Sequence, residues 1–264
     1  MKIAIIGTGN LGSSIAKGLV KNKSFTSLYL SDKNTSAVNE FIDEPYVKIT
    51  NSNASAVENS DIVIFALQPR HVEGVLREVE SLITQEHVIM SVAAGFSIAR
   101  IESVLGEDKH IIRVMPNTAI SIGKSMTCLS ANTVGQLKIE LAKTIFNQLG
   151  TTMVIPEEQI QAATVICASG IAFWMRLVRA TTQGAIQLGF EAHEAHKLAV
   201  QTCFGSASLL IESGKHPEQE IDRVTTPSGC TIEGLNAMEH QGLSSALIQG
   251  IVASFEKINQ IKNS

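Results

Sequence analysis

The sequence is poor in the features that mark secreted, metal-binding and nucleic-acid-binding proteins. Its 264 residues include four cysteines, Cys128, Cys167, Cys203 and Cys230, which lie far apart and form no CxxC pair. We therefore expect free thiols in a reducing compartment, with no disulfide framework and no metal site. The net charge of -4 offers no basic patch for nucleic acid and no polybasic membrane signal.

Long hydrophobic runs and a leader are also missing. No apolar run approaches the ~20 residues of a membrane-spanning helix, so we expect no membrane partner. Met1 and Lys2 lead directly into an apolar run, which leaves no room for a signal peptide. These absences predict a cytoplasmic protein.

A glycine triplet follows the first apolar run of the chain. Ile3–Ile6 is apolar without alternation, which is typical of a buried parallel strand, and a helix is expected from about Asn10. In the G-x-G-x-x-G spacing, Gly7 permits a tight turn, Gly9 lets a pyrophosphate approach the backbone, and Gly12 lets the helix pack closely. The helix N-terminus favours a phosphate, whereas an ordinary tight turn is the alternative. The predicted dinucleotide-binding residues of this loop are Gly7, Thr8, Gly9, Asn10, Leu11 and Gly12.

The residues after the second predicted strand, Ser27–Ser31, bear on the choice of cofactor. Asp32 stands ~20 residues beyond the glycine triplet, where a carboxylate accepts hydrogen bonds from ribose hydroxyls, which favours NADH. Ser31, Lys33 and Asn34 are small, basic or polar groups that could hold a 2′-phosphate instead, which favours NADPH. The sequence leaves this choice open, and a solvated acid after a strand is the plain alternative for Asp32.

Strand and helix patterns alternate through the rest of the first half. Further strands are predicted at 61–67, 88–92, 110–115, 123–129 and 152–155, and helices at 51–59, 72–79, 98–105 and 134–149, the last ending at a C′ Gly150. This alternation predicts an α/β Rossmann domain over residues 1–155, with a doubly wound, mostly parallel sheet. Ligands bind at the carboxyl edge of such sheets. The predicted cofactor-binding residues at this edge include Ala66, Leu67, Gln68, Pro69, Ala93, Ala94 and Gly95.

The strand signal disappears from Glu157 onward, which predicts an all-α domain over residues 156–264. Helices are expected at 159–188, 193–213, 217–223, 232–240 and 243–261. Apolar residues cover most of the helix circumference between Val165 and Leu188, and a helix of this kind must be buried on all sides. Because about a hundred residues bury few such helices, we infer a helical dimer interface. The alternative is that the chain's own helices wrap it.

A turn in the helical half is the second chemical signal. The segment Thr225–Thr231 carries several hydroxyls just before a helix. The backbone N–H groups of Gly229, Cys230 and Thr231 would lie at the helix start, where they could hold a carboxylate. Thr226 and Thr231 could add side-chain hydrogen bonds. A capping turn with Thr231 as N-cap explains the segment equally well.

Several stretches together resemble the pyrroline-5-carboxylate reductase family, from Ile3 to about Phe255. RVMPNT and VTTP-x-G-x-T are specific motifs, whereas the glycine triplet is shared by many unrelated families. The matching pieces are IGTGNLG (6–12), the strand ending at Gln68-Pro69, SVAAG (91–95), RVMPNT (113–118), the break Ala168-Ser169-Gly170, and VTTPSGCTIEGL (224–235).

The resemblance implies that a cyclic imine carboxylate, Δ1-pyrroline-5-carboxylate, is reduced to proline by NADPH or NADH. It implies a Rossmann domain followed by helices that form homodimers, often in rings of dimers. The nicotinamide would lie near the segment Ala93–Gly95 and near Met115, Pro116 and Asn117. Thr231 would be the catalytic residue that hydrogen-bonds the ring nitrogen. The substrate carboxylate would be held by Thr226, Gly229, Cys230 and Thr231.

The chain departs from the family pattern at a few positions. Gln68 replaces a lysine, Ile171 replaces a proline, and Ser228 and Cys230 alter the glycine-rich turn; Asp32 lies in the cofactor-selecting segment. The first four departures keep open a reductase of a different cyclic imine and a dinucleotide-binding sensor paralogue of weak activity. A β-hydroxyacid dehydrogenase is disfavoured, because those enzymes use a lysine in the long helix and this helix has none.

Overall fold

The computed structural model describes residues 1–23 and 25–262. The chain divides into two units. The first unit contains Met1–Ala168 together with the residues from Phe255 onward, and the second contains Ser169–Ser254.

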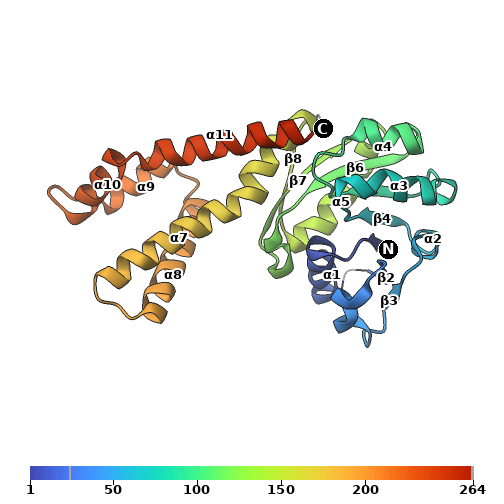
Figure 1. Cartoon of the computed structure of the whole chain (residues 1–264), viewed down its shortest axis with the longest axis horizontal. Coiled ribbons are helices and arrows are strands. Elements are labelled where there is room, and N and C mark those ends of the chain that lie inside the picture. The colour runs from blue at the N-terminus through green and yellow to red at the C-terminus, as the bar shows by residue number, and fades with distance from the viewer. Residues whose placement is uncertain (24, 263–264) are drawn as a thin grey trace. The chain divides into compact units, whose positions relative to one another are not determined.

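The first unit is built on one eight-stranded sheet (Figure 1). Its order is β3-β2-β1-β4-β5-β6-β7-β8, and every neighbouring pair is parallel except β6 and β7. The prediction of a doubly wound, mostly parallel sheet is therefore confirmed. The strands are β1 (Lys2–Ile6), β2 (Ser27–Ser31), β3 (Val47–Thr50), β4 (Ile62–Phe65), β5 (Val88–Ser91), β6 (His110–Met115), β7 (Ser125–Ala131) and β8 (Gly150–Val154).

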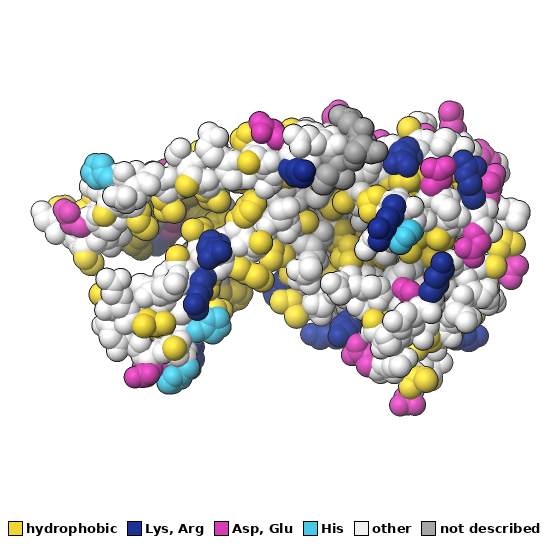
Figure 2. Space-filling view, in the orientation of Figure 1, with side chains coloured by type: hydrophobic (Ala, Val, Ile, Leu, Met, Phe, Trp, Pro, Cys, Tyr) yellow, Lys and Arg dark blue, Asp and Glu magenta, His cyan; other side chains and the backbone are white. Residues whose placement is uncertain are grey.

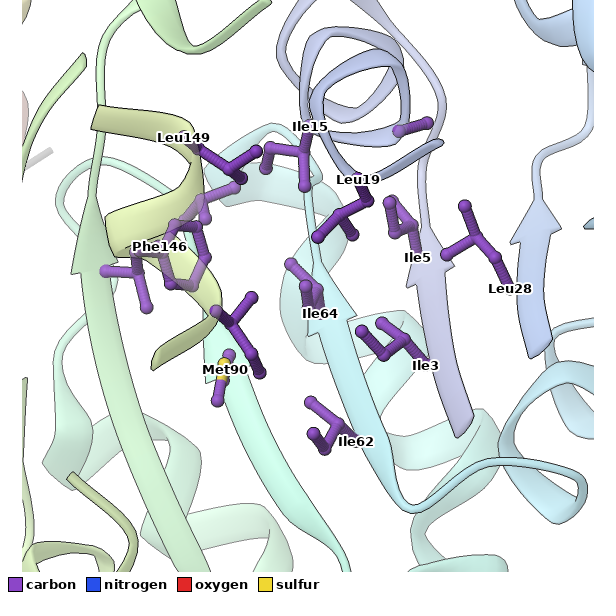
Figure 3. Packing of buried hydrophobic residues seen from close by; sticks show 14 of the residues in the cluster. Ile3, Ile5, Ile15, Leu19, Leu28, Ile62, Ile64, Met90, Phe146 and Leu149 are labelled. Atoms are coloured by element: carbon purple, nitrogen blue, oxygen red, sulfur yellow. The ribbon is translucent and has the colours of Figure 1, made fainter. Parts of the chain in front are cut away.

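Helices cover both faces of this sheet, because its central strands are apolar on both sides. One face packs against α1 (Asn10–Asn22) and α5 (Ile139–Phe146), where Ile15, Leu19 and Phe146 meet the strand side chains shown in Figure 3. The other face carries α2 (Asn53–Glu58), α3 (Pro69–Val79) and α4 (Ile98–Leu105). The unit also contains short helical segments. They are the 3-10 helices η1 (Thr35–Phe41), η2 (Glu80–Leu82), η3 (Thr118–Ile122), η4 (Gly135–Lys138), η5 (Asn147–Leu149) and η6 (Glu157–Gln159), the α-helical α6 (Ile160–Ala163) and the π-helical η7 (Thr164–Ser169).

Three local predictions differ from the structure. The edge strand β3 was not predicted, because its four residues are half-exposed and lack a long apolar run. The helix expected at 134–149 is broken into η4, α5 and η5. Gly150 is the C-cap of the short η5, in place of the C′ residue of one long helix, and it is also the first residue of β8; a Cβ there would lie 2.0 Å from the Ser125 carbonyl oxygen, so close strand approach requires glycine.

The second unit is helical, as the sequence predicts. It contains α7 (Gly170–Gln187), α8 (Ala192–Ser213), α9 (Pro217–Val224) and α10 (Cys230–His240), and α11 (Leu243–Lys262) begins in it. Large apolar side chains on these helices are exposed, among them Trp174 at 62%, Met175 at 65% and Phe204 at 59%. Figure 2 shows such hydrophobic side chains at the surface of the helices. Within the described residues the chain does not wrap α7 by itself, which favours the dimer interface over the alternative.

One helical stretch bears on the prediction that no segment resembles a membrane-spanning helix. Glu157–Gln187 spans 31 residues and contains an 18-residue window with a mean hydropathy of 1.4, so by length and composition alone it could cross a membrane. A single stretch of this kind is weak evidence for a span, since the core helix of a soluble protein has the same length and composition. Its apolar surface is equally suited to a second copy of the chain.

Candidate functional site

The glycine loop after β1 has the geometry that its spacing predicts. Gly7 has a φ of +95°, a conformation that favours glycine. A Cβ at Gly12 would lie 2.0 Å from the Gly7 carbonyl oxygen, so α1 packs directly on the loop. A Cβ at Gly9 would meet nothing within 4 Å, so this position is open on the side where a ligand would approach.

The N-terminus of α1 offers polar groups that the protein leaves unused. Gly9 is the N-cap residue and provides no side-chain cap, so the first N–H groups of the helix point outward. Among the described residues, the buried hydroxyl of Thr8 has no hydrogen-bond partner. Free donors, an open backbone and a helix dipole together fit the pyrophosphate of a dinucleotide.

A cavity of ≈ 610 Å³ extends from this loop along the carboxyl ends of β1, β2 and β4. The strand order reverses here, because β1 lies between β2 and β4, and such switch points bind ligands in α/β sheets. The cavity is lined by eight residues predicted from the sequence: Gly7, Gly9, Ser31, Asp32, Lys33, Ala66, Leu67 and Gln68.

Asp32 is fixed by two backbone groups at the mouth of β2. The Thr8 N–H donates to its Oδ2 at 2.6 Å, and the Asn34 N–H donates to its Oδ1 at 3.0 Å. The carboxylate thus links the glycine loop to the segment after β2. Lys33 lines the same cavity and, among the described residues, forms no ion pair. Asp32, which would favour NADH, and Lys33, which would favour NADPH, therefore both line the cavity.

Sequence reasoning missed several residues that line the cavity. Ser31 Oγ donates to Asn53 Oδ1 at 2.8 Å, and Asn53 Nδ2 donates to the Glu78 carboxylate at 3.1 and 3.2 Å. Arg70 and His71, in the first turn of α3, complete this polar wall. Their position directly after Pro69 could have indicated them, whereas Asn53 lies in the helix predicted at 51–59 without a local signal that places its side chain beside Ser31.

The residues predicted near the nicotinamide do not line this cavity. Ala93 is buried, and Gly95 lies at a separate cavity of ≈ 260 Å³ beside Arg113. Met115 is buried in an apolar cluster. The Asn117 side chain serves the fold: Oδ1 accepts from the Ala119 N–H at 3.0 Å, and Nδ2 donates to the Cys167 carbonyl at 3.1 Å. Direct contact of these residues with a cofactor stays a prediction, as it does for Thr8, Asn10, Leu11, Gly12, Pro69, Ala94 and Pro116.

The turn before α10 brings hydroxyls and free backbone donors together. The helix begins at Cys230 with Gly229 as its N-cap, so the alternative of Thr231 as N-cap is wrong. A Cβ on Gly229 would lie 2.3 Å from Thr226 Oγ1, which places that hydroxyl beside the helix start. The Gly229 N–H donates to the Thr226 carbonyl at 3.0 Å, so the expectation that it is free is also wrong.

The remaining donors at this helix start are unpaired within the described part of the chain. The N–H groups of Cys230 and Thr231 find no acceptor there, and neither do the hydroxyls of Thr226 and Thr231. Two backbone donors and two hydroxyls at a positive helix end can bind a carboxylate.

Ser228 adopts a backbone conformation that suits glycine. Its φ is +56°, in the left-handed region, and Lys23 at the end of α1 is the other non-glycine residue described with positive φ. Serine therefore adopts the same turn that glycine would form at this position, but with a lower stability of the folded protein.

Replacing Ser228 with glycine should stabilise the protein by about 0.5–1 kcal/mol, because the left-handed penalty exceeds the entropy that glycine adds to the unfolded chain. Urea unfolding measures this change. Lys23→Gly is the matched control, since it relieves the same strain in the other unit. Unchanged or reduced stability of Ser228→Gly would contradict the interpretation.

Two family models match the chain. Residues 2–95 match the model described as NADP oxidoreductase coenzyme F420-dependent. Residues 157–261 match the model described as pyrroline-5-carboxylate reductase dimerisation. The first match covers the glycine loop and the cavity, and the second covers the turn before α10.

Curated relatives and a solved structure agree with these matches. Pyrroline-5-carboxylate reductase 1 of Dictyostelium discoideum is 46% identical over 97% of this chain, and the chain spans about half (49%) of that relative's length. Pyrroline-5-carboxylate reductase 2 of the same organism is 40% identical over 97% of the chain and 91% of the relative. A pyrroline-5-carboxylate reductase structure from Coxiella burnetii is 27% identical, covers 98% of this chain and 97% of its own, and has a TM-score of 0.90.

Proposed function

This chain belongs to the pyrroline-5-carboxylate reductase family, and we propose that it reduces 1-pyrroline-5-carboxylate to L-proline with NAD(P)H. This reaction is the last step of proline biosynthesis. The observation that carries the proposal is the start of α10, where unpaired N–H groups and threonine hydroxyls lie together and could hold a carboxylate.

The chain's own residues perform binding and orientation. NAD(P)H, when bound, supplies the hydride that the imine carbon receives. The loop Gly7–Gly12 and the N-terminus of α1 hold the pyrophosphate, and the wall containing Asp32 holds the adenosine ribose.

At the substrate, the N–H groups of Cys230 and Thr231 and the Thr226 hydroxyl hold the carboxylate. The Thr231 hydroxyl orients the ring nitrogen, whose protonated form makes the neighbouring carbon electrophilic. Thr231 is a poor acid, so water or the substrate itself provides the proton. Fixed orientation of the reacting groups lowers the barrier.

The proposal is tested by oxidation of NADH and NADPH in the presence and absence of pyrroline-5-carboxylate. We expect oxidation that depends on the imine. Dinucleotide binding without imine-dependent oxidation would overturn the proposal and favour either another cyclic imine or a dinucleotide sensor, and a panel of cyclic imines separates these two.

Asp32→Asn should raise the ratio of NADPH to NADH efficiency about tenfold, because a negative charge that repels a 2′-phosphate is removed. Asparagine retains an oxygen that can accept the Thr8 N–H, so the glycine loop keeps its support. The measurement is kcat/KM for both cofactors. Asp32→Ala is the comparison that also removes the loop contact. An unchanged ratio in both variants would place Asp32 outside the ribose site.

We also propose a homodimer formed through the helical half, since residues 157–261 match a dimerisation domain and α7 exposes large apolar side chains. A ring of dimers is the further assembly.

Domains over 1–155 and 156–264 are supported by matches that lie within those limits, at 2–95 and 157–261. Four free cysteines support a reducing compartment such as the cytoplasm.

A further inference from the structure

Two cysteines of the first unit lie together, although neither belongs to the glycine loop or to the turn before α10. Cys128 lies on β7 opposite Met115 and is 3% exposed. Cys167 lies in the π-helical segment η7 and is partly exposed. Cys128 belongs to a buried apolar cluster with Met115 and Ile160, and Cys167 packs against this cluster. A pair of adjacent thiols, one buried and one accessible, is the arrangement of a reactive cysteine with a resolving partner.

The environment divides the two thiols into a reactive one and a protected one. The hydrogen bond from the Cys128 thiol lowers the pKa of Cys167 to about 7. The same hydrogen bond, together with burial, raises the pKa of Cys128 well above its usual range. The lowered pKa favours the thiolate of Cys167, and a thiol whose pKa is near the ambient pH reacts fastest in disulfide exchange.

We propose that Cys167 is a modification site for low-molecular-weight disulfides such as oxidised glutathione, and that Cys128 resolves the adduct into an internal disulfide. The Cys167 thiolate attacks one glutathione sulfur, and the other glutathione leaves as a thiolate. Cys128 then loses its proton to solvent, attacks the Cys167 sulfur and releases the second glutathione. Two protein thiols are oxidised by two electrons, and one glutathione disulfide is reduced to two glutathione thiols.

The internal disulfide would act on the segment after β6. The Cys167 carbonyl accepts the Asn117 Nδ2–H at 3.1 Å, so a shift of η7 towards β7 pulls on Asn117. This residue follows Met115 and Pro116, which the family resemblance assigns to the nicotinamide site. We therefore expect the oxidised protein to turn over more slowly. This consequence rests on the proposed function, whereas the thiol chemistry does not.

Peptide mapping of the intact protein after treatment with oxidised glutathione tests the modification. We expect a Cys128–Cys167 disulfide in the wild type, reversed by dithiothreitol. Cys128→Ser cannot close the bond and should accumulate glutathione on Cys167, and Cys167→Ser should form neither product. Mapping also separates this pair from Cys230, an exposed thiol of the other unit. Absence of both the disulfide and the adduct at Cys167 would overturn the proposal.

The pH dependence of Cys167 alkylation tests the role of Cys128. The rate should rise with pH as the thiolate forms, with a midpoint of about 7 in the wild type. Cys128→Ser keeps a hydroxyl donor and should hold the midpoint low. Cys128→Ala removes the donor and should move the midpoint towards the ordinary ~8.5. Equal midpoints in wild type and Cys128→Ala would overturn the pairing.

Imine-dependent turnover after oxidation tests the consequence. We expect at least a threefold loss in the wild type that dithiothreitol restores, and a smaller loss in Cys128→Ser treated identically, which controls for Cys230. A disulfide without loss of turnover would overturn the coupling through Asn117. If the reduced protein shows no turnover, the proposed function fails, and the mapping alone decides the modification site.

Discussion

Gly9→Ala is expected to leave the protein folded and to lower its affinity for NADPH and NADH by about 100-fold or more, a loss of roughly 2.7 kcal/mol. The added methyl meets no protein atom within 4 Å, so packing is unaffected. It occupies the open side of the loop, where the pyrophosphate must approach the backbone. Titration of the cofactor by fluorescence, together with urea unfolding, measures both effects.

Gly12→Ala is the matched variant of this experiment, because it changes the same loop from the packed side. Its Cβ would lie 2.0 Å from the Gly7 carbonyl oxygen, so we expect a loss of stability of about 3 kcal/mol. If Gly9→Ala bound both cofactors normally, the dinucleotide site would not be at this loop. If it unfolded as readily as Gly12→Ala, the open packing around Gly9 would be contradicted.

Thr231→Ala is expected to lower kcat for imine reduction by about 10- to 100-fold, the effect of losing one well-placed donor. Thr231 is the second residue of α10, its hydroxyl has no acceptor in the described part of the chain, and its backbone N–H remains after the substitution. Carboxylate binding should therefore survive, and KM should change less than kcat. Steady-state kinetics with varied imine measures both constants.

Thr231→Ser is the matched control, because it retains the hydroxyl and removes only a methyl group. We expect it to keep kcat within about threefold of the wild type. Equal losses in the serine and alanine variants would assign the effect to packing, and unchanged kinetics in both would remove Thr231 from the catalytic site.

The first unit was predictable where the chain is apolar and bounded by clear turns. Ser27–Ser31, Ile98–Leu105 and His110–Met115 form the predicted elements with the predicted bounds. A buried parallel strand or an amphipathic helix has a local pattern that tertiary contacts reinforce. The edge strand Val47–Thr50 has no such pattern, because half of its surface faces solvent.

The candidate site was predictable only in part, because its walls come from segments that the topology brings together. The glycine loop can be recognised by its spacing, but Asn53 meets Ser31, and Glu78 meets Asn53, only through the packing of α2 and α3 on the sheet. At the turn before α10, the structure differs from the sequence-based alternative in which residue caps the helix. The left-handed Ser228 lets Gly229 cap the helix, and this removes Thr231 from the N-cap position.

In the proposed homodimer, the exposed apolar side chains of α7 and α8 would make the stability of this protein depend on its concentration. Trp174 and Phe204 would be covered only when two chains meet, so mass action sets how much of the protein is folded with its surface protected. In a newly synthesised monomer this apolar surface is exposed to solvent, so the monomer is prone to aggregation until it dimerises. A higher rate of synthesis would therefore raise the folded, dimeric fraction, as a ligand or a stabilising mutation does, and dilution would lower that fraction.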